Sequence, residues 1–481
     1  MSEDNFYDLV IIGGGPGGYT AAIRASQLGK KVALIEKDKL GGVCLNRGCI
    51  PTKALIKAAT LVREIKDFKS FGIEVELCAL KGEVALARAR EVAERVGKGV
   101  ASLMKKNAIT VISGEASIFS AGQGNFLTRV MGRVGEDKGE DKKDKKEQEE
   151  KFLRSNGIII ATGGKYKTYP GLEHDGKLIL GAFEALALTK MPRSLAIIGA
   201  GAIGMEFAYF FSSFGTEVHV FEKMPSLLPM EDGDSSKEVE RACRRYGINF
   251  SLGVEKLSVC VDQANQHRGV VVMEEDKQHN FDLAIVAVGM QANLPNWGDS
   301  TPPVLQNGFI AVDDFSRTNI PGMWAIGDVS GPPLLAHVAA HQGVIAAEDF
   351  AGKNPYPLDR TTIPSGVYLR PEVALVGESE ESLKKRGVFY KIGKIPFMGN
   401  GKAVAANERE GHVKVLLGEK GELLGAHIVG AHATELIQEY ALLKSTGGTD
   451  QDLYNTIHSH PTLSEWLAEA VLLANGRAIN F

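Results

Sequence analysis

The chain has 481 residues, of which 44% are hydrophobic, with a formal net charge of −4 at pH 7 and a sequence pI near 6.3. This length exceeds what one hydrophobic core supports and predicts roughly three or four domains, and the small charge excludes a general attraction to nucleic acid or anionic membranes. Five cysteines do not make a secreted disulfide framework in so long a chain, and the acidic start is unlike a signal peptide, so we expect a cytoplasmic protein.

The first motif is an apolar strand over residues 7–13 that runs into a glycine-rich turn and an alanine-rich helix. A dinucleotide-binding loop needs this context: the first glycine permits the turn, the second admits a pyrophosphate, and the third lets helix and strand pack closely. The three glycines are Gly13, Gly15 and Gly18. The next predicted strand, 31–35, ends at Glu36, whose carboxylate can accept hydrogen bonds from a ribose. We therefore predict a first dinucleotide site.

Residues 41–53, GGVCLNRGCIPTK, carry Cys44 and Cys49 five positions apart in a segment that can begin a helix. Two such thiols can close into a disulfide on one face of one turn. A ring this small stabilises a fold by only roughly 2 kcal/mol, which favours a redox role over a structural staple. In a reducing compartment a disulfide that persists is usually catalytic or redox-sensing. The alternative is two unrelated buried thiols.

An apolar stretch over residues 195–215 is long enough to cross a membrane. Glu206 in its middle and three glycines favour instead a buried strand that turns into a helix, so we expect no membrane span. The glycines repeat the earlier spacing and are Gly199, Gly201 and Gly204. A strand over 217–221 then ends at Glu222, 18 residues past the last glycine, as in the first motif. This repeat predicts a second dinucleotide site.

Glu222 also bears on which nicotinamide cofactor is bound. Its carboxylate would hydrogen-bond a free ribose 2′-hydroxyl and repel a 2′-phosphate, and only Lys223 lies nearby where an NADP site would offer arginines. We therefore expect NAD rather than NADP. Nicotinamide transfers a hydride, whereas thiols exchange electrons by thiolate attack, so an intermediary is required that does both. A flavin does, and we expect FAD in the first site.

These motifs, in this order, resemble those of the flavin-dependent disulfide reductases, the class I pyridine nucleotide-disulfide oxidoreductase family. Within it, CLNRGCIPTK is most similar to the segment of dihydrolipoyl dehydrogenases, which reoxidise the lipoyl arms of 2-oxoacid dehydrogenase complexes. The resemblance covers essentially the whole chain. It implies an α/β fold with two Rossmann-like dinucleotide-binding domains and a C-terminal α+β dimerisation domain. Arg47 departs from the small apolar residue of many members, which affects detail near the thiols.

The expected domain boundaries follow the motifs. They give an FAD-binding domain (1–168), a NAD-binding domain (169–292), a central segment that completes the FAD site (293–356) and a dimerisation domain (357–481). The first domain contains a charged run at 136–150 with eight acidic residues and five lysines. Such a run cannot form a core, so we expect a solvated loop or hairpin tip rather than a docking element for a partner.

The resemblance also implies which residues contact each cofactor. For FAD they are Gly13, Gly15, Gly18, Glu36, Lys53, Gly114, Thr162, Gly163, Asp328, Ala336 and His337. For NAD they are Gly199, Gly201, Gly204, Glu206, Glu222, Val254 and Gly289. Lys53 is expected to start a helix, and Asp328 to end a short strand that begins at residue 323. His337 taken alone is more typical of a packed histidine than of a proton carrier.

The last motif, His458-Ser-His460-Pro-Thr, is followed by Glu465. Two histidines so spaced could suggest a metal, but no cysteine or carboxylate cluster accompanies them, so we expect no metal site. The resemblance implies that His460 is the acid-base and that Glu465 holds its ring. It further implies that Cys44 and Cys49 form the redox-active disulfide, and that His460 of one subunit serves the cysteines of the other in a homodimer.

The function implied by the resemblance is oxidation of protein-bound dihydrolipoamide, with reduction of NAD⁺ through the disulfide and FAD. Lipoyl domains and the E2 core of 2-oxoacid dehydrogenase complexes are the implied partners, and the H protein of a glycine cleavage system stays open as another. Glutathione reductase is an alternative that would need arginines beyond Glu222, and mercuric reductase one that would need paired cysteines in the C-terminal NGRAINF. An NADH oxidase or diaphorase, and an inactive structural or binding module, are further alternatives. Intact catalytic residues weigh against the last.

Overall fold

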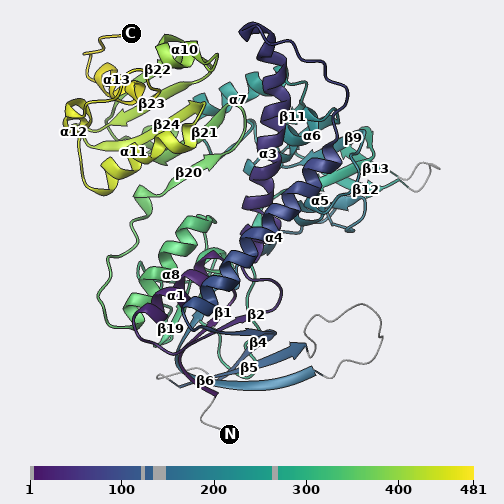
Figure 1. The fold of residues 1–481 in the computed structure, drawn as a ribbon, viewed down its shortest axis with the longest axis vertical. Helices are drawn as coiled ribbons and strands as arrows, with labels where there is room; N and C mark the ends of the chain where they lie inside the picture. The colour runs from purple at the N-terminus through teal and green to yellow at the C-terminus, as the bar shows by residue number, and fades with distance from the viewer. Residues whose placement is uncertain (1–4, 121–124, 134–147, 263–268) are drawn as a thin grey trace. The chain divides into compact units, whose positions relative to one another are not determined.

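The computed structural model describes residues 5–120, 125–133, 148–262 and 269–481 (Figure 1). The chain divides into two compact units. Unit 1 takes its described residues from 1–51, 88–167 and 290–358, and unit 2 from 52–87, 168–289 and 359–481. No helix in the described residues is long and apolar enough to cross a membrane. The four-part domain division expected from the motifs stays a prediction.

Unit 1 is built on a seven-stranded sheet in the order β3-β2-β1-β6-β5-β4, with β19 beside β6. Its strands are β1 (Phe6–Ile12), β2 (Val32–Glu36), β3 (Thr110–Ser113), β4 (Glu115–Ser120), β5 (Phe126–Arg133), β6 (Gln148–Ile160) and β19 (Met323–Ala325). Strands β1, β2, β3, β19 and the end of β6 run parallel, whereas β4, β5 and β6 pair antiparallel. The parallel strands at the centre are apolar and buried, as expected for a sheet covered on both faces.

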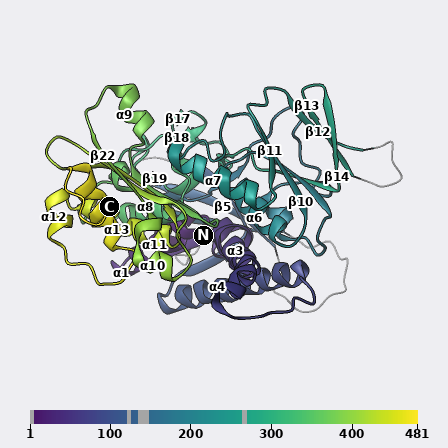
Figure 2. The ribbon, with the colours of Figure 1, turned by 90° about the horizontal axis from the view of Figure 1, so that it is seen from above.

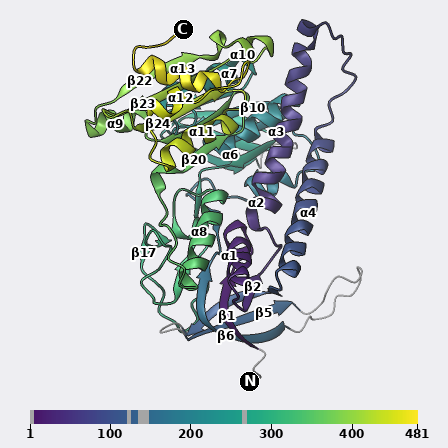
Figure 3. The same cartoon turned by 60° about the vertical axis from the view of Figure 1, so that its left-hand side comes forward.

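Two helices of unit 1, α1 (Pro16–Gln27) and α8 (Ala336–Phe350), lie side by side (Figure 3). They approach closely because glycines face backbone: a Cβ added at Gly343 would lie 2.5 Å from the carbonyl oxygen of Gly17. The other short elements of the unit are α2 (Gly42–Arg47), the 3₁₀ helix η3 (Gly327–Ser330) and the strands β7 (Gly164–Tyr166), β16 (Met290–Ala292), β17 (Leu305–Gln306) and β18 (Phe309–Ile310). Helices α3 (Cys49–Glu64) and α4 (Gly82–Lys106) belong partly to each unit.

The charged run expected at 136–150 joins two neighbouring strands. β5 and β6 pair antiparallel up to Arg133 opposite Gln148. Residues 134–147 lie outside the described residues, so the expectation of a loop or hairpin tip there stays a prediction.

Unit 2 contains a parallel five-stranded sheet in the order β11-β10-β9-β15-β8. The strands are β8 (Ile179–Leu180), β9 (Ser194–Ile198), β10 (Glu217–Glu222), β11 (Asn249–Leu252) and β15 (Leu283–Val286), and the helices α5 (Ala182–Leu186), α6 (Ala202–Ser213) and α7 (Gly233–Arg245). A small antiparallel sheet is formed by β12 (Leu257–Val261), β13 (Val270–Glu274) and β14 (Lys277–Phe281) (Figure 2). The apolar stretch at 195–215 is thus β9 followed by α6, as expected.

The rest of unit 2 is an antiparallel five-stranded sheet in the order β20-β21-β24-β23-β22. Its strands are β20 (Pro364–Val367), β21 (Glu372–Gly377), β22 (Lys391–Pro396), β23 (His412–Leu417) and β24 (Leu423–Gly430). The helices are α9 (Glu380–Arg386), α10 (Gly401–Ala405), α11 (Ala433–Ser445), α12 (Asp450–Asn455), α13 (Glu465–Ala474) and the 3₁₀ turns η2 (Ile65–Phe71), η4 (Arg360–Thr362) and η5 (Phe397–Gly399). α11 packs on β21 and β24, and α13 on β22 and β23, in one apolar core. The predicted fold class is confirmed.

Two local expectations are wrong. Helix α3 begins at Cys49 rather than at Lys53, and Gly48 separates it from α2, so the two cysteines lie on different helices rather than on one turn. Asp328 lies in the 3₁₀ helix η3, because β19 ends at Ala325, three residues earlier.

Candidate functional site

The first glycine loop is held by contacts between backbone atoms. Gly13 has φ = +108°, and a Cβ added there would lie 2.2 Å from the carbonyl oxygen of Ala161 at the end of β6. A Cβ at Gly18 would lie 1.8 Å from the carbonyl oxygen of Gly13, so helix α1 packs directly onto the loop. Gly15 precedes α1 as its N-cap, where helix N–H groups point outward. The loop therefore has the geometry that suits a pyrophosphate.

The carboxylate at the end of β2 closes this loop. Glu36 accepts hydrogen bonds from Gly14 N (2.7 Å) and Asp38 N (2.8 Å), one on each oxygen. Gly114 N donates to the backbone carbonyl of Glu36 (2.9 Å), which brings Gly114 to the same edge. The structure thus brings together the acidic residue, Gly114 and the glycine loop.

The turn after β6 carries polar groups on the other side of the loop. Asn293 donates through Nδ2 to Thr162 O (3.1 Å) and through its backbone N to Gly163 O (2.9 Å). Thr162 Oγ1 is buried without a hydrogen-bond partner among the described residues. Asp328 lies beside this turn, since a Cβ at Gly164 would be 3.1 Å from its Oδ2. Burial raises the pKa of Asp328.

The start of α8 supplies Ala336 and His337, the first two residues of that helix. This helix start packs against α1: a Cβ added at Gly17 of α1 would lie 3.0 Å from the carbonyl oxygen of Ala339 in α8. The predicted FAD residues of unit 1 therefore surround one glycine loop, although they come from segments more than 300 residues apart.

The cysteine segment rests on this same loop. Gly41 N donates to Gly14 O (2.8 Å), and a Cβ added at Gly42 would lie 2.7 Å from Gly15 Cα. Gly41 and Gly42 both have positive φ values, +95° and +58°, which other residues rarely adopt. Cys44 and Cys49, which follow, are partly buried and in near contact with each other. The geometry thus places the start of the cysteine segment on the first glycine loop.

Two further residues lie near the cysteines. The sequence did not single out Tyr19, and it left the effect of Arg47 open. Burial, together with the charge of Cys44, raises the pKa of Tyr19 in the first turn of α1. Arg47 forms an ion pair with Asp38, with both side chains about half exposed. Arg47 is therefore accommodated at the surface.

The second glycine loop, in unit 2, repeats the first nearly atom for atom. Gly199 has φ = +104°, and a Cβ there would lie 2.5 Å from Ala287 O. Glu222 accepts from Ala200 N (2.7 Å) and from Met224 N (2.8 Å). A Cβ at Gly204 would lie 2.0 Å from Gly199 O, whereas one at Gly201 would meet no atom within 4 Å. The position expected to face a pyrophosphate is therefore open.

Other predicted NAD residues lie around this loop. Val254 N donates to Glu222 O (3.0 Å), and Gly289, with φ = +109°, follows β15 just as Gly163 follows β6. Val254 therefore lies beside Glu222, at the same end of the second sheet.

Glu206 is engaged by other residues of unit 2. Its two oxygens accept from Lys53 Nζ at 2.9 and 3.0 Å, and Oε1 also accepts from Tyr368 N (3.1 Å). Lys53 Nζ lies 4.2 Å from the centroid of the Tyr368 ring, within cation–π range. Residues predicted to contact different cofactors, Lys53 and Glu206, are thus an ion pair.

The histidine motif is in unit 2 and lies before α13. His460 Nδ1 is 2.9 Å from Glu465 Oε1, and Glu465 Oε2 accepts from Thr462 N (2.7 Å). Partial burial acts against it, but the hydrogen bonds from Thr462 and His460 hold the pKa of Glu465 below its ordinary value. The His460 side chain is 81% exposed, which leaves Nε2 accessible. His458 is occupied differently, since its Nε2 lies 2.7 Å from Glu439 Oε1.

The sequence matches the pyridine nucleotide-disulphide oxidoreductase model over residues 7–343 and the dimerisation domain of the same family over 363–471. The chain belongs to this family.

The family assignment agrees with individual relatives. The chain is 43% identical to a dihydrolipoyl dehydrogenase of Zymomonas mobilis and 40% identical to that of Bacillus subtilis, in each case over 99% of both chains. Among solved structures it is similar to LpdA of Mycobacterium tuberculosis, with a TM-score of 0.87 and 25% identity over 96% of this chain and 99% of that one. It is also similar to the flavoprotein disulfide reductase RclA of Escherichia coli, with a TM-score of 0.80 and 26% identity over 98% and 99%.

The pyridine nucleotide-disulphide oxidoreductases use FAD and NAD(P), and the residues of this member fit two dinucleotides. Each loop presents helix N–H groups and a carboxylate at the end of the next strand. The first also has the carboxylate of Asp328 and the Thr162 hydroxyl, which has no hydrogen-bond partner in the described part of the chain; both suit a polar ligand.

Sequence reasoning missed Tyr368 in this family member. It touches both Lys53 and Glu206, and the only local signal was an aromatic residue two positions before Arg370-Pro371, directly after strand β20.

Proposed function

We propose that the chain is a dihydrolipoyl dehydrogenase: it oxidises protein-bound dihydrolipoamide to lipoamide and reduces NAD⁺ to NADH, with FAD in the first site. The observation that carries the proposal is the seating of the cysteine segment on the first glycine loop, where a Cβ at Gly42 would lie 2.7 Å from Gly15 Cα. Relatives named dihydrolipoyl dehydrogenase at 40–43% identity over nearly their full length support the choice of substrate.

In this proposal the disulfide between Cys44 and Cys49 receives the electrons of the substrate. One thiolate of dihydrolipoamide attacks Cys44 Sγ, the bond to Cys49 breaks, and a mixed disulfide forms while Cys49 leaves as a thiolate. The second thiol of the substrate then attacks the substrate sulfur that is bonded to Cys44. The bond to Cys44 Sγ breaks, lipoamide is released, and two electrons remain on the enzyme dithiol. When bound, FAD would supply the chemistry that takes two electrons from the dithiol and passes them to NAD⁺ as a hydride.

The protons are handled by the histidine motif. His460 accepts a substrate thiol proton at Nε2, while its Nδ1 bonds to Glu465, which fixes the tautomer and orients the ring. Thr462 N holds the other oxygen of Glu465, so the carboxylate itself is positioned. We further propose that His460 of one subunit serves the cysteines of the other.

NAD is proposed over NADP because of Glu222. Its oxygens accept from the backbone of Ala200 and Met224, so the carboxylate is held where a ribose 2′-hydroxyl could donate and a 2′-phosphate would be repelled.

The match to the family's dimerisation domain supports a homodimer. Lipoyl domains and the E2 core of 2-oxoacid dehydrogenase complexes, in the cytoplasm, complete the proposal, which retains the four predicted domains and the predicted contact residues.

The proposal is tested by steady-state turnover of the purified flavoprotein. We expect rapid reduction of NAD⁺ with dihydrolipoamide, slow reduction of NADP⁺, and little reduction of glutathione disulfide, thioredoxin or oxygen by NADH or NADPH.

Cys49→Ser should lose at least about 10³-fold in dihydrolipoamide turnover, because a redox pair acts as a unit, and should keep its yellow bound flavin. A matched control is Cys260→Ser, which changes an exposed cysteine in β12. Unchanged turnover in Cys49→Ser, or a preference for glutathione disulfide, would contradict the proposal.

A further inference from the structure

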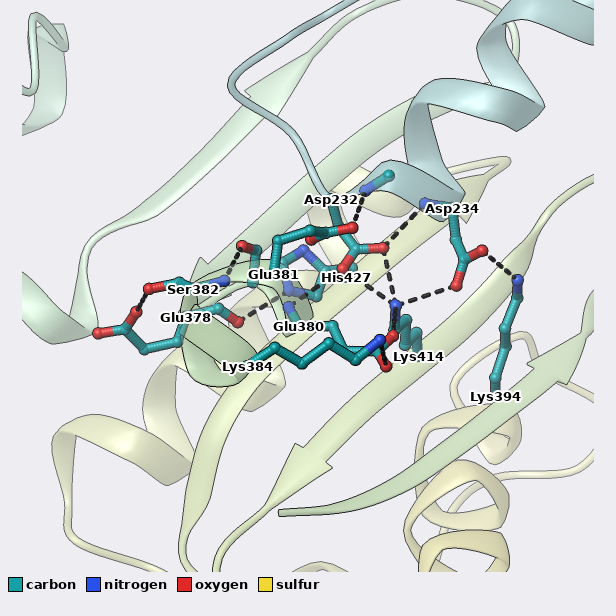
Figure 4. Close-up of polar contacts among 12 residues, drawn as sticks. Asp232, Asp234, Glu378, Glu380, Glu381, Ser382, Lys384, Lys394, Lys414 and His427 are labelled. Atoms are coloured by element: carbon teal, nitrogen blue, oxygen red, sulfur yellow. Dashed lines mark hydrogen bonds and ion pairs between the residues drawn. The ribbon is translucent and has the colours of Figure 1, made fainter. Parts of the chain in front are cut away.

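Lys414 is a charged residue in the interior of unit 2. It lies in the middle of β23, and its side chain is 1% exposed. Its Nζ contacts both oxygens of Asp232 (2.9 and 3.0 Å), Asp234 Oδ2 (2.9 Å) and Glu380 Oε2 (2.7 Å) (Figure 4). Burial alone would lower the pKa of Lys414, but these three carboxylates raise it well above its ordinary value. We call these four residues the Lys414 cluster.

The Lys414 cluster joins the starts of two helices. Asp232 is the N-cap of α7 and accepts from Asp234 N (3.1 Å), and it also accepts from Glu380 N (3.3 Å) at the start of α9. In exchange, Gly233 N of α7 donates to Glu381 Oε1 (3.1 Å). Each helix thus receives a carboxylate from the other, where the helix dipole favours negative charge (Figure 4). The position of α7 is therefore fixed by residues of β23 and α9.

Helix α7 in turn fixes the loop at the second dinucleotide site. Ser236 Oγ of α7 donates to Leu228 O (3.2 Å), and Leu228 N donates to Ala200 O (2.9 Å) in the glycine loop. Ala200 N donates to Glu222, at the other end of the same connection. Leu228 is buried and has φ = +48°, a conformation that is costly for leucine and persists only when its surroundings impose it. A continuous chain of contacts therefore runs from Lys414 to Ala200 and Glu222.

We propose that Lys414, through Asp232 and the α7 N-terminus, is a positioning residue for nucleotide binding at the second glycine loop. Lys414 touches no nucleotide in this scheme; it holds the connection between Glu222 and Asp232 in the shape that presents the loop. The inference rests on the second dinucleotide site of the proposed function but not on the identity of the thiol substrate.

The test measures NAD⁺ binding to the oxidised flavoprotein by titration calorimetry, together with KM and kcat for NAD⁺. Lys414→Met removes the charge and keeps the length of the side chain. Asp232→Asn keeps an acceptor for Asp234 N and leaves Lys414 two carboxylates, so it provides the comparison if Lys414→Met folds poorly. We expect Kd and KM for NAD⁺ to rise by at least about fivefold in both variants, with kcat at saturating NAD⁺ and flavin content unchanged.

The matched control is Lys384→Met. Lys384 pairs with Glu380 from outside the cluster, and its side chain is 62% exposed, so its replacement removes a positive charge beside the cluster without releasing Asp232. A folded Asp232→Asn protein with an unaltered Kd for NAD⁺, or an equal rise in Kd in Lys384→Met, would overturn the inference. If the wild type binds NAD⁺ but does not oxidise dihydrolipoamide, the proposed function fails and the inference still receives its test.

Discussion

At the residue scale, the two dinucleotide loops contain glycines that are required for different reasons. Gly204 has no room for a side chain, since a Cβ there would lie 2.0 Å from a backbone oxygen. Gly201 has an ordinary backbone conformation and open space around its Cα. A glycine that the protein needs for its own packing can thus be told from one that only a ligand would need.

This difference predicts opposite effects of the same substitution. Gly204→Ala should lower the free energy of unfolding by roughly 1–3 kcal/mol or more, because the backbone must move apart to admit the methyl group. Gly201→Ala should leave thermal stability nearly unchanged and weaken NAD⁺ binding, because the methyl group would meet only the pyrophosphate. Thermal melts of both proteins without nucleotide, followed by NAD⁺ titration, check this. A large loss of stability in Gly201→Ala would refute it.

At the scale of single elements, strand β23 is buried along its whole length although it carries both His412 and Lys414. Burial, reinforced by the charge of Lys394 and opposed by Asp234 and Asp232, lowers the pKa of His412 to about 4. His412 Nε2 has no hydrogen-bond partner among the residues that the structure describes. The strand therefore holds a neutral imidazole.

His412 should make stability depend on pH between about 6.5 and 4. A histidine with a lowered folded-state pKa binds its proton more readily when unfolded, so its contribution is present above pH 6.5 and is lost as the pH falls towards 4. From these values the loss is about 2 kcal/mol at pH 5. We expect the melting temperature of His412→Phe to fall less between pH 7.5 and pH 5 than that of the wild type.

Two neighbours also have shifted pKa values, and both are common to the variant and the wild type. Burial lowers the pKa of His427, which acts in the same direction as His412. Burial and Asp232 raise the pKa of Glu231 to about 7, which acts in the opposite direction. The difference between variant and wild type isolates His412, and parallel curves would contradict the assignment.

The elements that could be predicted from the sequence are those whose defining residues lie close together along the chain. The two glycine loops and Glu36 and Glu222 were predicted because turn, helix start and acidic residue lie within about 25 residues of each other. The pair of Lys53 with Glu206 was missed because 153 residues separate them, and the Lys414 cluster because Asp232 is 182 residues away. The lysine in the apolar strand HVKVLL indicates that buried carboxylates must pair with it, because an unpaired buried charge is costly. The sequence does not indicate which carboxylates these are. The break at Gly48 was missed because the segment reads as one helix.

At the scale of the whole molecule, the proposed chemistry needs residues from both units. Cys44 and Cys49 belong to unit 1, and His460 and Glu465 to unit 2. The match to the family's dimerisation domain covers His460 and Glu465. Whether the histidine serves its own or the partner's cysteines is therefore a question about the dimer.

Hybrid dimers distinguish the two arrangements. If each site combines cysteines of one subunit with His460 of the other, a dimer of one Cys49→Ser and one His460→Gln subunit has one intact site. Random pairing of equal amounts makes about half of the dimers hybrid, so co-refolded or co-expressed subunits should show about a quarter of wild-type activity. Two differently tagged subunits allow the hybrid to be purified and assayed. An inactive hybrid would show that each subunit works alone.

The pairing of Arg133 with Gln148 has a practical consequence for engineering. Opposite residues of antiparallel strands lie about 5 Å apart, so the two ends of the segment between them are already joined by the sheet. The fold on either side therefore does not depend on how many residues make the connection. This position is suited to receive an inserted epitope or fluorescent reporter.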